Sequence, residues 1–151
     1  MYKNLLVPID GSGTARRGLE EAVRLAKSLG GRIRLMHVVD ELVVMSPDVT
    51  GTLTPEILEQ LRAYGAKVLA AGAAVARAAG VEVDTRLLEA MGGLVGEQVI
   101  REAAAWPADV IVCGTHGRRG VRRIVMGSDA EYIVRHAPVP VLLVRAQDTE
   151  R

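Results

Sequence analysis

Residues 109–117, with the sequence DVIVCGTHG, decide how this chain folds. Four of the first five residues are apolar, and a short continuous apolar run is typical of a strand buried on both faces of a sheet. The run stops at Gly114, where a loop rich in glycine and arginine begins and continues to Gly127. Ligands of open α/β sheets bind beyond the carboxyl ends of the strands, so this loop is the first candidate for a functional site.

Strands and helices alternate on both sides of this stretch. Apolar runs predict strands at 5–9, 33–39, 81–88, 109–113 and 140–144, and apolar residues at helical spacing predict helices from the turn at 10–14 to Gly30, over 54–79, around 94–100 and over 128–136. Strands that alternate with helices indicate a parallel sheet joined by right-handed crossovers. The sequence therefore predicts one α/β domain over residues 1–151, with an open five-stranded parallel sheet and helices on both of its faces.

The two most apolar strands, 5–9 and 109–113, are expected at the centre of this sheet. If they are neighbours, the loops that leave them, 10–14 and 114–127, face each other across one crevice. The strand at 81–88 alternates apolar and polar residues at its start, which is typical of a sheet edge.

The glycine spacing of the second loop points to an anion. The loop reads Gly114-Thr115-His116-Gly117, then nine residues, then Gly127-Ser128. Glycines allow the backbone to approach a ligand closely, and successive exposed N–H groups form an anion-binding concavity. Ser128 opens a helix, whose N-terminus favours phosphate, and His116 and Arg118 add local positive charge.

Composition excludes several classes of protein. Hydrophobic residues make up 49% and charged residues 25% of the 151 residues, which is ordinary for a soluble globular chain. A net charge of +1 argues against a polyanion binder driven by bulk charge, and 3% aromatic residues argue against a stacking platform for single-stranded nucleic acid. No run of about 18 apolar residues predicts a membrane span. The single cysteine, Cys113, fits a reducing compartment, so we expect a cytoplasmic protein without nucleic-acid or membrane partners.

These motifs carry a resemblance that covers essentially the whole chain. The spaced glycines ending in Gly127-Ser128, the last strand PVPVLLV at 138–144 and the opening LLVPIDGS at 5–12 resemble the ATP-binding branch of the universal stress protein family. The resemblance implies strand order 3-2-1-4-5, the adenine nucleotide alpha hydrolase-like arrangement. It also implies ATP in the crevice, with or without Mg²⁺, homodimerisation through the last strand and a regulatory role under stress.

The resemblance also implies roles for individual residues. Asp10 matches the family acid that meets the ribose or the metal–phosphate side, and Pro8 and Ile9 are expected to line the purine. Val38 and Val39 match the strand end whose backbone groups hydrogen-bond adenine. The phosphate and ribose cradle is matched by Gly114, His116, Gly117, Gly127 and Ser128. Asp129 departs from the pattern. A carboxylate at a helix start competes with phosphate for the same N–H groups, so Asp129 is expected to act against phosphate binding.

The composition of the last strand, apart from the family resemblance, also indicates a partner chain. Residues Val141–Val144 are uniformly apolar and stand near the end of the sequence, which suits a sheet edge. An exposed apolar edge is an aggregation hazard unless it is paired, and antiparallel pairing with a second copy would cover it in a twofold dimer. A cover formed by the chain's own tail is the alternative.

Other functions remain open at this point. Gly11-Ser12-Gly13 with Asp40 suggests a dinucleotide site, but Arg16 occupies the position of its third glycine. The sequence contains no P-loop, and its three histidines lack ligand-spaced partners for a metal. A slow ATPase, with His116 or Asp10 orienting water, and an interaction module with a vestigial pocket, suggested by Asp129, are the alternatives to a nucleotide-binding regulator. No feature names the protein partner.

Overall fold

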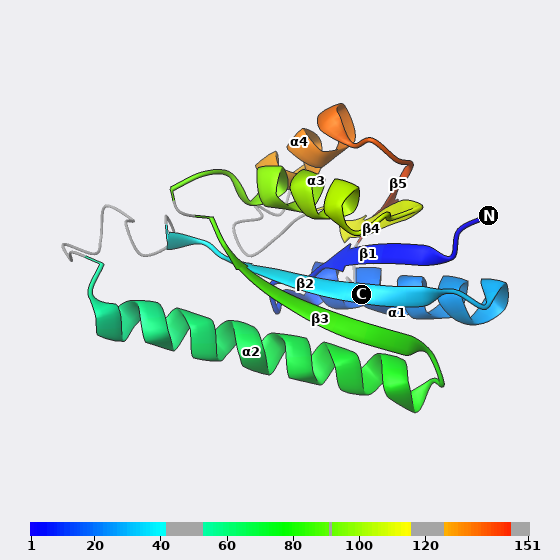
Figure 1. The fold of residues 1–151 in the computed structure, drawn as a ribbon, viewed down its shortest axis with the longest axis horizontal. Helices are drawn as coiled ribbons and strands as arrows, with labels where there is room; N and C mark the ends of the chain where they lie inside the picture. The colour runs from blue at the N-terminus through cyan, green and yellow to red at the C-terminus, as the bar shows by residue number, and fades with distance from the viewer. Residues whose placement is uncertain (42–52, 91, 116–125, 146–151) are drawn as a thin grey trace, which may run out of the picture.

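The computed structural model describes residues 1–41, 53–90, 92–115 and 126–145. Strands and helices alternate throughout these residues (Figure 1). In chain order the elements are β1 (Asn4–Pro8), α1 (Gly13–Leu29), β2 (Arg32–Val39), α2 (Pro55–Ala78), β3 (Glu82–Glu89), α3 (Val95–Ala105), β4 (Val110–Gly114), α4 (Ser128–His136) and β5 (Val141–Val144).

The strands form one parallel sheet in the order β3-β2-β1-β4-β5, as predicted. Leu5 of β1 pairs with Ile33 of β2 on one side and with Val110 of β4 on the other. The strands that the sequence placed at the centre, β1 and β4, are therefore neighbours. The alternating strand β3 lies at one edge, and the apolar strand β5 lies at the other.

Helices cover both faces of the sheet, with α1 and α2 on one face and α3 and α4 on the other (Figure 1). The side chains of β1 alternate between two cores: Leu5 and Val7 pack toward α1 and α2, whereas Leu6 packs toward α3. All three side chains are fully buried. This explains why the central strands consist of continuous apolar residues.

Helix boundaries follow from capping residues. Ser12 begins α1, where its Oγ accepts a hydrogen bond from Ala15 N, and Thr54 begins α2 in the same way through Ile57 N. Gly30 ends α1 with a φ of 62°, the left-handed conformation that favours glycine. The strand predicted at 81–88 begins one residue later, because Val81 N donates to Ala76 O and closes the end of α2 instead of joining the sheet.

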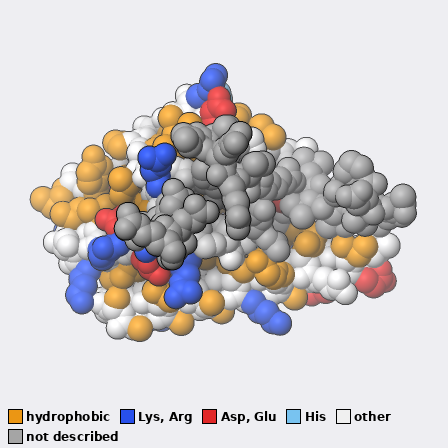
Figure 2. All heavy atoms as spheres, turned by 180° about the vertical axis from the view of Figure 1, so that it is seen from behind, with side chains coloured by type: hydrophobic (Ala, Val, Ile, Leu, Met, Phe, Trp, Pro, Cys, Tyr) orange, Lys and Arg blue, Asp and Glu red, His pale blue; other side chains and the backbone are white. Residues whose placement is uncertain are grey.

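On the face seen in Figure 2, the described side chains form no single basic patch. Lysine and arginine side chains are scattered among apolar and neutral ones over the described part of that face. This distribution agrees with the net charge of +1. Among the described residues, no helix is both long and apolar enough to cross a membrane.

Candidate functional site

The start of α1, which follows the turn after β1, packs against the last residue of the neighbouring strand β4. A Cβ atom on Gly114, the last residue of β4, would lie 2.9 Å from Thr14 Cγ2 and 3.0 Å from Thr14 O. A Cβ atom on Gly18, one turn further along α1, would lie 3.4 Å from Gly114 N. The first turns of α1 therefore pack directly against Gly114, and only glycine permits this approach.

The turn between β1 and α1 is fixed by its own hydrogen bonds. Ser12 N donates to the Asp10 carboxylate at 2.9 Å, and Ser12 Oγ caps α1. Gly11 has a φ of 84°, which explains the glycine between these two residues. Ser12 therefore caps α1, and the Asp10 carboxylate is held beside the first turn of this helix.

Two side chains from other elements brace the same turn. Tyr64 of α2 donates its hydroxyl to Asp10 O at 3.2 Å. His37 of β2 is buried, and its Nδ1 lies 2.8 Å from Ile9 O. A carbonyl oxygen can only accept, so His37 Nδ1 carries the proton. The two rings meet edge to face, with centroids 6.1 Å apart.

Tyr64 is a site residue that the sequence reasoning missed. It lies 54 residues from Asp10, and no local motif links the two positions. A Cβ atom on Gly11 would lie only 2.2 Å from the Tyr64 hydroxyl, so the tyrosine fits because Gly11 has no side chain. The one available signal was a tyrosine directly before Gly65, a glycine in the middle of a long helix.

The two predicted purine contacts at the end of β1, Pro8 and Ile9, differ in where their side chains lie. Pro8 is half-buried at the end of the strand, where it pairs with Met36. The Ile9 side chain, by contrast, lies in the core between α1 and α2, where a Cβ atom on Gly72 would be 3.0 Å from Ile9 Cδ1. Only the backbone of Ile9 is therefore placed near the turn.

The two predicted adenine contacts at the end of β2, Val38 and Val39, differ in the direction of their main-chain groups. Val39 O accepts a hydrogen bond from Ala90 N at 3.1 Å, so this carbonyl belongs to the contact with β3 and the residue after it. Main-chain groups of successive strand residues point to opposite sides, so Val38 presents its N–H and C=O toward β1. Ile9 N donates to Met36 O at 2.8 Å, and Val38 lies two residues beyond that bond. Both valine side chains are buried.

The two ends of the glycine-rich loop meet beside β5. Gly127 N donates to Thr115 O at 2.8 Å, and Thr115 N donates to Val144 O at 3.0 Å. Gly127 is the N-cap of α4, and no side-chain hydrogen bond from this position closes the helix start. Gly114, Gly127 and Ser128 are thereby brought to one place. His116, Gly117 and Arg118 lie outside the described residues.

Asp129 has a partner in a different helix. Its Oδ1 accepts a hydrogen bond from Gly96 N at 3.2 Å, in the first turn of α3. The N-cap residue of α3, Leu94, provides no side-chain hydrogen bond, and Asp129 supplies one from α4. The sequence predicted that this carboxylate competes with phosphate. In the structure, its hydrogen bond joins α4 to α3.

Cys113, the single cysteine of the chain, is buried in β4. Burial raises the pKa of the Cys113 thiol to about 11, so this thiol stays protonated at neutral pH. Within the described ranges, no group of three histidine, cysteine, aspartate or glutamate side chains is placed to hold a metal ion.

Comparisons with known proteins agree with this geometry. The model of the universal stress protein family matches residues 1–145. Universal stress protein MJ0531 of Methanocaldococcus jannaschii is 31% identical over 150 residues, which cover 99% of this chain and 86% of that protein.

Solved structures show the same fold. The hypothetical protein MJ0577, the subject of a structure-based assignment of biochemical function, has a TM-score of 0.84 at 23% identity and covers 99% of both chains. A universal stress protein family member from Burkholderia pseudomallei has a TM-score of 0.74 at 30% identity, with 96% of this chain and 97% of that chain covered. The chain belongs to the universal stress protein family.

Proposed function

We propose that this protein binds ATP at the carboxyl ends of β1, β2 and β4 and acts as a regulator in the stress response. The observation that carries the proposal is the contact between Gly114 and Thr14. It brings the Asp10 turn beside the end of β4, and the hydrogen bond from Gly127 N to Thr115 O brings the start of α4 to the same edge of the sheet. This edge is where open α/β sheets bind ligands.

The phosphates are assigned to the loop and the start of α4. Gly127 and Ser128 place the first-turn N–H groups of α4 beside Gly114, and a helix N-terminus stabilises an anion. His116, Gly117 and Arg118 belong to the same proposed cradle by their places in the motif. Asp10 is the residue that would hold Mg²⁺ if the triphosphate requires it, and the ion would offset phosphate charge there.

The nucleoside is assigned to the first two strands. The Asp10 carboxylate, held by Ser12 N, is the proposed ribose contact, and the main chain of Val38 is the proposed adenine contact. Pro8 would lie against the purine ring. We assign Ile9 and Val39 a supporting role, because the Ile9 side chain is in the core and Val39 O already accepts from Ala90.

Structures of similar fold support an adenine nucleotide. They include a universal stress protein from Archaeoglobus fulgidus in complex with dAMP and one from Arabidopsis thaliana with AMP bound. Another is a universal stress protein in complex with cAMP. We extend the ligand to ATP because the spaced glycines from Gly114 to Ser128 offer more main-chain amides than one phosphate needs.

The position of Asp129 bears on the alternative of a vestigial pocket. That alternative requires a carboxylate which repels phosphate at the start of α4. Because Asp129 Oδ1 accepts from Gly96 N, the α3 amide offsets its charge, and the hydrogen bond draws the carboxylate toward α3. This contact favours a working site.

We further propose that the protein acts in the cytoplasm as a homodimer paired through β5. Residues Val141–Val144 form one edge of the sheet, and Leu142 is 38% exposed there. An apolar edge of this kind is stabilised when a second copy covers it. Nucleotide occupancy would then reach the dimer contact directly, because Val144 O accepts from Thr115 N in the glycine-rich loop.

Isothermal titration tests the ligand. ATP, ADP and AMP are titrated into protein purified without added nucleotide, with and without Mg²⁺. Saturable heat with at least one of them is the expected result, and replacement of Gly127 by leucine should remove it while the thermal melt stays cooperative. Absence of saturation with all three nucleotides would contradict the proposal.

A further inference from the structure

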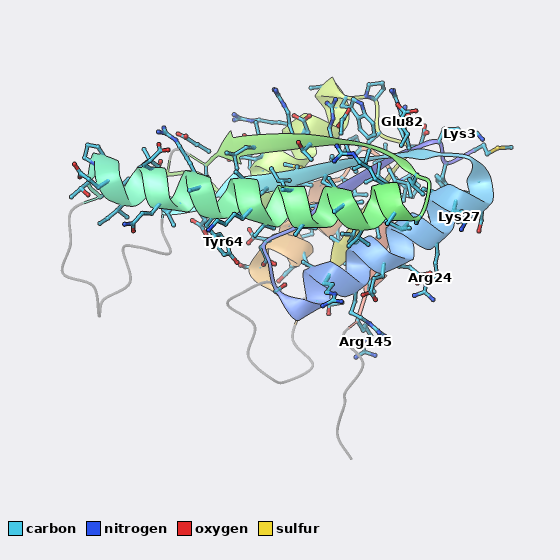
Figure 3. The ribbon with its side chains drawn as sticks, turned by 90° about the horizontal axis from the view of Figure 1, so that it is seen from below. Lys3, Arg24, Lys27, Tyr64, Glu82 and Arg145 are labelled. Carbon is cyan, nitrogen blue, oxygen red and sulfur yellow. The ribbon has the colours of Figure 1, made fainter. Side chains whose placement is uncertain are left out.

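The outer edge of β3 presents a row of main-chain hydrogen-bonding groups. Among the described strands, β3 is the last on its side of the sheet, and α2 lies beneath it (Figures 1 and 3). Ala90 N points to β2, because it donates to Val39 O. Main-chain groups alternate sides along a strand, so Val83, Thr85 and Leu87 present their N–H and C=O groups outward.

A shallow groove of about 470 Å³ runs between this edge and α2. Its lining combines small side chains of the helix with two residues of the strand, and includes Ala66, Ala70, Ala73 and Arg77 of α2 and Thr85 and Leu87 of β3. Leu87 is 37% exposed and lines this groove. The groove is the place that the inward-facing side chains of one further strand would occupy.

We propose that β3 of a second copy occupies this place, antiparallel to the first and centred on Thr85. Residues directly opposite each other in an antiparallel pair point to the same face of the sheet. In a symmetric pair, the twofold axis must therefore lie between two copies of the same residue, which face each other. An axis at Arg86 sets that cation opposite itself, and an axis at Asp84 does the same with an anion. An axis at Thr85 sets no like charges opposite each other.

This register is complementary on both faces of the sheet. On the groove side, Val83 lies opposite Leu87 of the second copy, and both side chains cover the alanines of α2. On the other side, Asp84 lies opposite Arg86 of the second copy. That pair is a non-hydrogen-bonded one, in which side chains approach most closely.

The charges around Asp84 and Arg86 extend across such an interface. Within the chain, Arg34 holds Asp84 at 2.7 Å, and Glu102 lies 3.7 Å from Arg86. The Asp84 and Arg86 side chains remain 49% and 55% exposed, so each can take a second partner. Pairing about Thr85 joins the two networks with alternating sign, which disfavours other registers.

Pairing through β3 would give each chain a second twofold interface. The proposed β5 dimer uses the opposite edge of the sheet, so the two contacts do not compete. A chain that uses both edges forms assemblies larger than a dimer. The β3 contact does not depend on nucleotide binding.

Disulfide trapping tests the register. Opposite residues of a hydrogen-bonded pair have Cα atoms about 5.5 Å apart, within the range that a disulfide spans, so T85C should form a covalent dimer under mild oxidation. E82C is the matched control, because Glu82 is exposed on the same strand but six positions, about 20 Å, from its own counterpart. The native Cys113 is buried and adds little background.

The expected yield of covalent dimer is at least about tenfold higher for T85C than for E82C, because only Thr85 lies on the axis. Adding Leu142→Lys, which charges the β5 edge, should leave this yield unchanged and so separates the two interfaces. In light scattering, the Leu142→Lys variant should be a dimer. Adding Arg86→Glu to that variant should give a monomer. Equal trapping of both cysteine variants, or a Leu142→Lys chain that is monomeric at every concentration, would overturn the proposal.

Discussion

The two ends of the sheet differ in how their polar groups are used. At the amino end, Asp109 accepts hydrogen bonds from the N–H groups of Lys3 and Asn4, both at 2.8 Å, and Asn4 Nδ2 donates to Pro107 O. At the carboxyl end, the start of α4 lacks a side-chain cap, and glycines replace side chains where the loops meet. Figure 3 shows the two regions, with Lys3 toward one end and Tyr64 toward the other.

This difference separates stability from binding. The amino end closes its own hydrogen bonds and seals the core with Trp106, over which the guanidinium groups of Arg34 and Arg32 lie at 4.8 and 5.3 Å. At the carboxyl end, the N-cap Gly127 provides no side-chain hydrogen bond to the start of α4, and we propose that main-chain N–H groups there bind an anion. Substitutions at the first end should therefore change the free energy of unfolding, and substitutions at the second should change affinity.

The largest effect is expected from adding a methyl group at each end. Gly114→Ala places a Cβ atom 3.0 Å from Thr14 O, and Gly31→Ala places one 2.9 Å from Lys3 O. Both should lower the free energy of unfolding by about 1–3 kcal/mol, because neither backbone can yield freely. Only Gly114→Ala should abolish nucleotide binding in titration calorimetry. Equal affinities in the two variants would break the comparison.

A smaller effect on stability is expected at Asp109. The N–H groups of Asn4 and Lys3 stabilise its ionised form and lower the pKa of this carboxyl. The stabilisation is present above the unfolded-state pKa of about 3.9 and is lost as the pH falls through the lower folded-state value. Asp109→Asn should cost about 1–2 kcal/mol near neutral pH and flatten the acid limb of stability, measured by denaturant titration. Nucleotide affinity should not change, and a weakened affinity would join the two ends energetically.

The smallest effect is expected at the brace on the Asp10 turn. Tyr64→Phe removes the hydrogen bond to Asp10 O and keeps the ring against His37. Loss of one such bond should weaken nucleotide binding by roughly three- to tenfold. Tyr2→Phe, at the exposed amino end, is the matched control and should bind like the unmodified chain. If both variants bind alike, Tyr64 supports the fold but not the ligand.

The sequence predicted the location of the candidate site, at the carboxyl end of the sheet, better than it predicted the contacts of the residues there. The continuous apolar runs at 5–9 and 109–113 predicted two central strands, and the family resemblance supplied the order that makes β1 and β4 neighbours. Helix ends depend on chemistry between residues three or four apart, and the caps at Ser12, Thr54 and Gly30 therefore lie within two residues of the predicted helix ends.

Contacts between distant elements left no such signal. Asp129 was interpreted from its neighbours in α4, but its carboxylate bonds Gly96, 33 residues away in α3. Ile9, the last residue of the predicted strand, was assigned to the purine through the family resemblance, but its side chain lies in the core against Gly72. Such outcomes depend on how helices pack across the sheet, which no local pattern encodes.

Crystals of the protein grown with ATP provide the most direct measurement. We predict electron density for the phosphates between Gly114 and the first turn of α4, with the adenine beside the main chain of Val38. Nucleotide density at any other place, or a carboxyl end that stays empty at concentrations that saturate the titration, would contradict the account.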